Sequence, residues 1–248
     1  MTSTTTSTTT PTPVTLVGAT GLTGSHTLHS ILSSTHPFNL KVLTRRSLPP
    51  TEPSKNPLTS LTTKLYSDLF EAPTDGSAIA EKGGVYVSCL GTTRANAGGT
   101  ANQEKLDLGL NRDLAKKARE DGADTMILVS TGGANHSSHF FYMRIKGQLE
   151  EDVKSMGFKN VYILRPGALL GERTESRPAE WLMQGTFKGL KKIGLAFNMA
   201  TQAEDVGACI AELAANPPQD KVLTLYDDQI MVYAKKYRDH STSPTSST

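Results

Sequence analysis

Cysteine and long apolar runs are both scarce in this sequence of 248 residues. The two cysteines, Cys89 and Cys209, are too few for a disulfide scaffold and lack the CxxC spacing of zinc sites, which indicates a reducing compartment such as the cytosol. No uninterrupted apolar stretch approaches the roughly 20 residues that a membrane-spanning helix needs. The sequence therefore argues against a small secreted domain and predicts a chain that does not cross a membrane.

An excess of charge of one sign is also missing. The chain has 26 Lys and Arg against 24 Asp and Glu, a formal net charge of +2, and its basic residues are spread out rather than gathered in one segment. Nucleic-acid-binding domains usually carry a basic patch or stripe. We therefore expect no nucleic-acid partner.

The two ends of the chain have little that could form a core. Residues 1–12, MTSTTTSTTTPT, are hydroxyl-rich and free of acids like a transit peptide, but they lack the arginines that give such peptides a basic face. The last residues, STSPTSST, have a similar composition. We expect a disordered tail at 1–12, one domain at 13–232 and a flexible tail at 233–248.

Between these tails, short β-branched runs alternate with longer segments of helical period. The runs expected to be strands are VTLVG from Val14, LKVLT from Leu40, TKLYS from Thr63, GVYVSCL from Gly84, TMILVS from Thr125 and NVYILR from Asn160. Apolar residues at three- and four-residue spacing predict helices near 22–34, 103–121, 140–156 and 203–215. This order predicts an α/β protein with a doubly wound parallel sheet.

Two other segments have no regular period. Residues 47–60 contain four prolines and are expected to form a long irregular loop. Residues 171–200 include Trp181 and several glycines, at the place where such a sheet would need a small C-terminal segment that covers a substrate.

Three glycines, Gly18, Gly21 and Gly24, follow the first expected strand and open the first expected helix. A backbone turn of this kind can approach a pyrophosphate closely, and the amides and dipole of the helix start favour the anion. The spacing is GxxGxxG and not the common GxGxxG, and a tight strand-to-helix turn needs glycine for the same steric reasons. The motif alone leaves both interpretations open.

The end of the second strand gives the next indication. Folds that bind NAD place an acidic residue there for the ribose hydroxyl, but this sequence reads VLTRRS. Arg45 and Arg46 could instead clamp a 2′-phosphate by charge-assisted hydrogen bonds. The pair favours NADP(H), the alternative being two solvated surface arginines.

Tyr142 and Lys146 are four residues apart in YMRIK, so a helix would place both on one face. A nearby ammonium would lower the pKa of the phenol, which could then exchange a proton with a substrate oxygen while a hydride moves. Ser130, at the expected end of the fifth strand, could donate a hydrogen bond to the same oxygen, with Thr131 as the adjacent alternative. An exposed helical pair is the competing explanation of Tyr142 and Lys146.

Other chemistries find less support. His136 and His139, like His26 and His29, are three residues apart, but no carboxylate or cysteine nearby completes a metal site. No metal is therefore expected. A serine hydrolase would need a GxSxG elbow, which the sequence lacks.

The motifs GATGLTG, SCLGTTR, the serine with YxxxK, and LRPGALLGERTESRPAEWL together resemble one family. The chain is similar to the atypical short-chain dehydrogenase/reductases, specifically the fungal "found in mitochondrial proteome" proteins and their animal relative, the Tat-interacting oxidoreductase. The resemblance extends from about Val14 to Val232, and CLGTTR and ESRPxEWL are more specific than the glycine motif.

This resemblance implies an NADP-binding Rossmann domain and assigns residues to it. The implied cofactor contacts are Gly18, Thr20, Gly21, Leu22, Thr23 and Gly24 at the pyrophosphate, Arg45 at the 2′-phosphate, and Leu90, Gly91 and Thr92 along the cofactor. The implied catalytic residues are Ser130, Tyr142 and Lys146, the last two also touching the cofactor, while Arg165, Pro166 and Gly167 would close over the nicotinamide side. The fungal proteins are peripheral to the mitochondrial outer membrane, although the tail here lacks a basic presequence; surface attachment is compatible with a soluble chain.

The leading hypothesis is an NADP(H)-dependent oxidoreductase that acts on a small-molecule carbonyl or alcohol. The alternatives are an NADP(H)-sensing regulatory or scaffold protein with little turnover, and a sugar epimerase that uses the same cofactor and tyrosine. The mitochondrial outer membrane is the expected location and the cytosol its alternative.

Overall fold

The computed structural model describes residues 10–170 and 200–242, which are built around a parallel sheet of seven strands in the order β3-β2-β1-β4-β5-β6-β9. The strands are β1 (Thr12–Val17), β2 (Phe38–Thr44), β3 (Ser60–Leu65), β4 (Val85–Ser88), β5 (Thr125–Val129), β6 (Asn160–Leu164) and β9 (Val222–Leu225). Two short strands, β7 (Ala168–Leu170) and β8 (Ala200–Gln202), form a separate parallel pair. The predicted doubly wound parallel sheet is confirmed.

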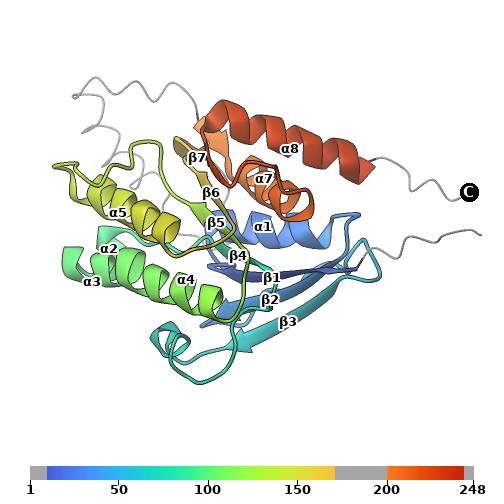
Figure 1. Ribbon diagram of the computed structural model, residues 1–248, viewed down its shortest axis with the longest axis horizontal. Coiled ribbons are helices and arrows are strands. Elements are labelled where there is room, and N and C mark those ends of the chain that lie inside the picture. Colours follow the sequence, from blue (N-terminus) through green and yellow to red (C-terminus); the bar gives the residue numbers. More distant parts are fainter. Residues whose placement is uncertain (1–9, 171–199, 243–248) are drawn as a thin grey trace, which may run out of the picture.

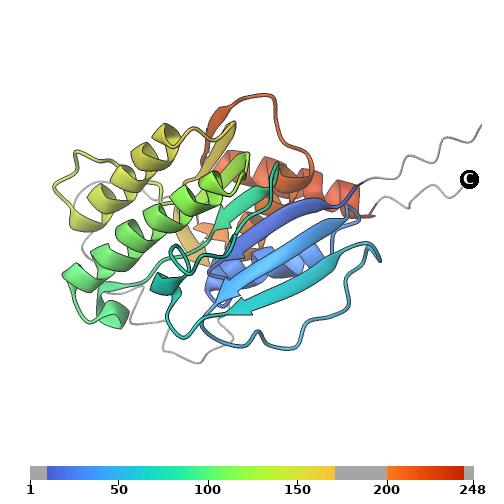
Figure 2. The same cartoon turned by 60° about the horizontal axis from the view of Figure 1, so that its bottom comes forward.

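Helices cover both faces of this sheet (Figures 1 and 2). They are α1 (Leu22–Leu32), α2 (Arg94–Ala97), α3 (Thr100–Glu104), α4 (Asn111–Glu120), α5 (Phe141–Ser155), α7 (Ala203–Ala215) and α8 (Asp227–Thr242), with a 3-10 turn at Leu69–Glu71. Helices α1, α7 and α8 lie together on one face, and α4 and α5 cover the other.

The central strands are buried on both faces, which explains why their sequences are apolar without alternation. Every residue of β4 (VYVS) and β5 (TMILV) is buried. One core cluster contains Leu16, Leu28 and Ile210, from β1, α1 and α7, and the other contains Leu114 and Leu149, from α4 and α5. Burial of these side chains accounts for the strand and helix periods seen in the sequence.

The order of the strands reverses at β1, which pairs with β2 on one side and β4 on the other. In open sheets of this kind, ligands bind outside the carboxyl ends of the strands at such a switch point. The loops that follow β1, β4 and β5 meet at this edge and supply the candidate site described below.

All six predicted strands are present, but one begins earlier than predicted, and β7, β8 and β9 were not predicted. The third strand is Ser60–Leu65, three residues earlier than the predicted TKLYS segment, because its pairing with β2 starts at Ser60 opposite Asn39. The seventh strand of the large sheet, β9, lies at its edge, and its Val222 is exposed.

The predicted helices are also present, and α8 extends beyond the predicted end of the domain. The boundary at residue 232 falls inside α8, where Ile230 and Ala234 are buried and Tyr237 donates a hydrogen bond to the Ser30 carbonyl at 2.7 Å. The helix predicted at 103–121 is α3 followed by a π-helical segment, Lys105–Leu110, and by α4. The segment 171–199, predicted to cover a substrate, lies outside the described residues, as do 1–9 and 243–248.

Candidate functional site

The glycine turn after β1 is packed so closely that it requires glycine at two positions. Gly18 has a φ of +85°, and a Cβ there would lie 2.6 Å from the carbonyl carbon of Cys89. A Cβ on Gly24 would lie 2.0 Å from the Gly18 carbonyl oxygen. The first contact joins this turn to the loop after β4, and the second presses the first turn of α1 against the end of β1.

The start of α1 presents backbone donors without a competing side chain. Gly21 occupies the N-cap with no side-chain cap, and the first turn contains no acidic residue. Because the first amides of a helix have no partner within it, those of Leu22, Thr23 and Gly24 are available to an anion. Thr20 and Gly21 are exposed, so the turn is open to solvent. This geometry suits a phosphate and supports the predicted pyrophosphate contacts.

Two polar side chains hold the loop after β4, which contains Leu90, Gly91 and Thr92. The Asp107 carboxylate accepts a hydrogen bond from the Thr92 amide at 2.8 Å, and the Asn111 amide donates to the Leu90 carbonyl at 3.2 Å. The loop therefore has a fixed path beside the glycine turn, as the predicted cofactor contacts require.

Arg45 and Arg46 lie directly after β2, at the same edge of the sheet. Both residues are exposed, and the Arg46 amide donates to the Thr44 hydroxyl at 3.1 Å. Because β2 pairs with β1 up to Leu43 opposite Val17, the arginines follow the strand next to the glycine turn. Their position is the one at which a dinucleotide fold reads the ribose of its cofactor.

Lys146 is buried, with 3% of its surface exposed, and its ammonium donates to the Val129 carbonyl at 2.9 Å. Burial lowers the pKa of Lys146, and the nearby Asp107, Glu150 and Cys89 act in the opposite direction. The hydrogen bond holds the ammonium at the carboxyl end of β5. Lys146 and Tyr142 are both on α5, as predicted.

The pKa of Tyr142 differs from the prediction. The residue is 39% exposed as a whole, yet desolvation of its phenol and the charge of Asp107 raise its pKa to about 12. The expected lowering by Lys146 is wrong for this state. At neutral pH Tyr142 is a phenol that can donate its proton.

Ser130 is buried at the end of β5, and its hydroxyl donates to the carboxylate of Glu150. Glu150 is fully buried and forms an ion pair with Arg165, whose Nε lies 3.0 Å from the Glu150 Oε1. Arg165 also donates to the Tyr226 hydroxyl at 2.9 Å. The predicted serine is thus joined to a buried ion pair that the sequence reasoning did not identify.

The segment after β6 continues from this ion pair to the loop after β5. The Pro166 carbonyl accepts from the Gly132 amide at 2.9 Å, and the Gly167 amide donates to the Asp227 carboxylate at 2.8 Å. The structure therefore brings the predicted Arg165-Pro166-Gly167 segment beside the end of β5.

Asp107 and Asn111 were missed as well, although the sequence carried a signal. Gln103, Asp107 and Asn111 recur every four residues and continue into Leu114 and Ala118, so they occupy the buried stripe of a helix where apolar residues are expected. Asp107 lies in the π-helical segment, a local irregularity often found at functional sites.

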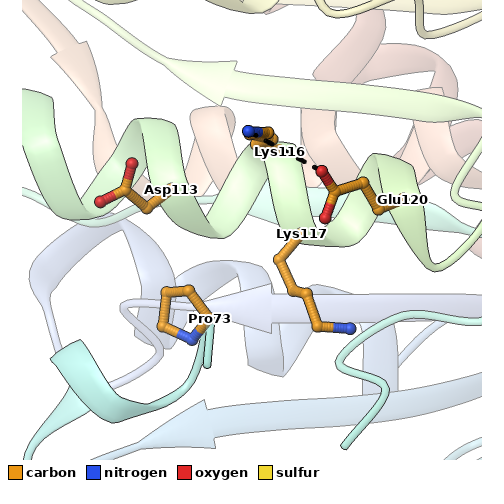
Figure 3. A pocket seen from close by; sticks show the side chains of 5 residues that line it. All are labelled: Pro73, Asp113, Lys116, Lys117 and Glu120. Atoms are coloured by element: carbon orange, nitrogen blue, oxygen red, sulfur yellow. Dashed lines mark ion pairs between the residues drawn. The ribbon is translucent and has the colours of Figure 1, made fainter. Parts of the chain in front are cut away.

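A separate depression on the outer side of α4 has a volume of about 200 Å³ (Figure 3). Its lysines already have partners, because Lys116 pairs with Glu120 at 3.9 Å and Lys117 pairs with Asp121. Asp121 accepts from the Ile79 amide, ahead of β4. None of the candidate-site residues lines this depression.

Within residues 10–170 and 200–242, no helix combines the length and apolarity needed to cross a membrane. The same ranges contain no group of three or more His, Cys, Asp or Glu side chains arranged to hold a metal ion.

Solved structures of similar fold include an NAD complex and a reductase. MoeE5, solved in complex with UDP-glucuronic acid and NAD, is 16% identical, with a TM-score of 0.60 over 87% of this chain and 76% of that protein. ChuY, an anaerobillin reductase from Escherichia coli O157:H7, is 20% identical, with a TM-score of 0.54 over 87% of this chain and 97% of that protein. These likenesses show a Rossmann-like fold.

Sequence relatives give the family. The HIM1 family model matches residues 78–196. The mitochondrial protein fmp52 of Aspergillus niger is 38% identical over 230 residues, which cover 89% of this chain and 97% of the relative. The chain belongs to the fmp52 family.

Proposed function

We propose that this protein is an NADP(H)-dependent oxidoreductase of the atypical short-chain dehydrogenase/reductase type, acting on a small-molecule carbonyl or alcohol. The observation that supports it most is the meeting of the glycine turn and the buried Lys146 at one edge of the sheet. A phosphate cradle after β1 and an acid–base pair on α5, the helix that follows β5, are what a hydride transfer needs.

Each residue of the site has a separate role in carbonyl reduction. NADPH, when bound, supplies a hydride to the carbonyl carbon. Tyr142, a phenol at neutral pH, donates its proton to the carbonyl oxygen and regains one from solvent. Lys146 would contact the nicotinamide ribose, and a hydroxyl at the end of β5, predicted as Ser130, would donate to the same oxygen. In the oxidative direction these steps run in reverse.

The test is to replace Tyr142 by Phe, which removes the proton and keeps the ring. We expect NADPH to bind with unchanged affinity in a fluorescence titration, while NADPH consumption with a panel of aldehydes, ketones and quinones falls by about 10²–10⁴-fold. If the wild type binds NADPH but consumes none with any carbonyl, an NADP(H)-sensing role is favoured. Turnover that leaves the cofactor's oxidation state unchanged would indicate epimerisation.

Preference for the phosphorylated cofactor is the second element of the proposal. Arg45 and Arg46 stand where an NAD-binding fold carries an acid, and a guanidinium can bind a 2′-phosphate through paired hydrogen bonds. In Arg45→Ala we expect NADPH affinity to fall about tenfold or more, with NADH affinity unchanged, since a charge-assisted hydrogen bond is lost. Arg46→Ala, measured in the same way, gives the contribution of the second arginine. An equal loss for both cofactors would show that Arg45 does not read the phosphate.

A mitochondrial location, peripheral to the outer membrane, completes the proposal. It is supported by the names of the relatives, which are called mitochondrial, and is compatible with the lack of a spanning helix in the described ranges. Fractionation of cells should place the protein with mitochondria, and alkaline carbonate should release it. Recovery in the cytosol, or retention in the membrane after carbonate, would contradict this location.

A further inference from the structure

The two hydroxyl residues at the carboxyl end of β5 differ in their hydrogen bonding. Ser130 is 6% exposed, and its hydroxyl donates to the Glu150 carboxylate while its amide donates to the Leu164 carbonyl at 2.8 Å. A hydroxyl has a single proton to donate. The proton of Ser130 is therefore already used within the protein.

The Glu150 carboxylate holds the hydrogen bond from Ser130 firmly. Its carboxylate is fully buried and receives hydrogen bonds from Arg165, with Nε at 3.0 Å from Oε1 and 3.2 Å from Oε2, as well as from Ser130. Arg165 is in turn fixed by the Tyr226 hydroxyl. A buried carboxylate needs all of its donors, so turning the Ser130 hydroxyl toward a substrate would leave the charge less satisfied.

Thr131 differs from Ser130 in the hydrogen bonding of its hydroxyl. It is half-buried, its backbone carbonyl accepts from the Ala134 amide at 3.0 Å, and its hydroxyl makes no hydrogen bond to any residue that the structure describes. The loop that it begins is held at Gly132 by the Pro166 carbonyl and at Asn135 by the Met143 carbonyl at 3.0 Å. Thr131 is thus a fixed residue with a free hydroxyl, two residues after Val129, whose carbonyl accepts the hydrogen bond from Lys146.

We propose that Thr131, and not Ser130, supplies the hydroxyl that meets the substrate oxygen, and that Ser130 is a positioning residue that fixes Glu150. This inference rests on the proposed function. In reduction, negative charge develops on the carbonyl oxygen, and the Thr131 and Tyr142 hydroxyls would donate to it together. Ser130, Glu150 and Arg165 would hold the end of β5, helix α5 and the start of the segment after β6 in register.

Matched substitutions on the full chain separate the two hydroxyls. Thr131→Val removes one hydroxyl at nearly constant shape, Thr131→Ser retains it, and Ser130→Ala removes the other. The readouts are NADPH affinity, the kcat and KM for a carbonyl that the wild type reduces, and the melting temperature. We expect Thr131→Val to lose about 10²–10³-fold in kcat with unchanged NADPH affinity and melting temperature, and Thr131→Ser to recover most of the loss.

Ser130→Ala should instead lower the melting temperature and lose less kcat than Thr131→Val. The loss of stability should also be non-additive with that of Glu150→Gln, because both variants break the same hydrogen bond. The result that would overturn the inference is the reverse: a loss of kcat in Ser130→Ala at normal stability, with Thr131→Val behaving as wild type. In that case the proposed function would stand. A wild type that reduces no carbonyl would overturn both, yet the coupling between Ser130 and Glu150 would still be measurable.

Discussion

At the scale of single residues, the pKa values in the candidate site depend on charged side chains that lie near one another. The sequence spacing correctly placed Tyr142 and Lys146 on one helix, and the strand-end hydroxyls were identified. The sequence could not predict that Lys146 donates to the Val129 carbonyl or that Asp107, more than thirty residues earlier, faces the same pair. Spacing gives the shared face of a helix but not the long-range partners that determine a pKa.

Replacing Asp107 by Asn tests this charge arrangement. The Asp107 charge raises the pKa of both Lys146 and Tyr142, so its removal should lower both. If reduction needs a protonated phenol and an ammonium, the alkaline limb of the pH profile of NADPH consumption should move to lower pH. Asn keeps an acceptor for the Thr92 amide, and Asp113→Asn, an exposed site with an ion pair to Arg112, is the control. An unchanged profile would show that Asp107 does not act on the pair.

At the scale of elements, hydrophobic periodicity was sufficient for the central strands and most helices. It failed where burial is incomplete, because β9 is an edge strand and α8 packs mainly on α7, with Ile230 and Ala234 among its buried residues. It predicted a helix at 103–121 but not the π-helical segment within it, Lys105–Leu110. A pattern read from apolar residues alone does not identify the polar groups, such as Asp107 and Asn111, that this helical region buries.

The packing of α7 on α1 gives a prediction at this scale. Gly207 of α7 sits where a Cβ would lie 2.6 Å from the backbone carbon of His26 on α1. Gly207→Ala should therefore force the two helices apart and cost about 1–3 kcal/mol in the free energy of unfolding, although Ala favours a helix. The control is Gly109→Ala, whose nearest neighbour would be 3.9 Å away. Denaturant unfolding measures both, and equal stability of the two variants would contradict the packing argument.

At the scale of the whole molecule, the candidate site bridges the two helical layers. The glycine turn belongs with α1, on the face that α7 and α8 cover, whereas Asp107 and Lys146 come from helices of the opposite face. The turn and the loop after β4 already touch at Gly18 and Cys89, across the switch point between β1 and β4. A dinucleotide along this edge would contact elements of both layers, so its binding energy should stabilise the domain as one unit.

This bridging predicts a single, cofactor-dependent unfolding transition. A ligand at 100 times its Kd stabilises the folded state by about 2.7 kcal/mol, and each kcal/mol raises the melting temperature of a domain of this size by about 2–4 °C. By these relations, saturating NADPH should raise the melting temperature of the protein by roughly 5–10 °C. The unfolding transition in calorimetry should stay single. In Gly24→Ala, whose Cβ would meet the Gly18 carbonyl oxygen at 2.0 Å, NADPH should give little shift. A transition that splits on adding NADPH would mean that the cofactor stabilises one layer alone, and an equal shift in Gly24→Ala would mean that the phosphates bind elsewhere.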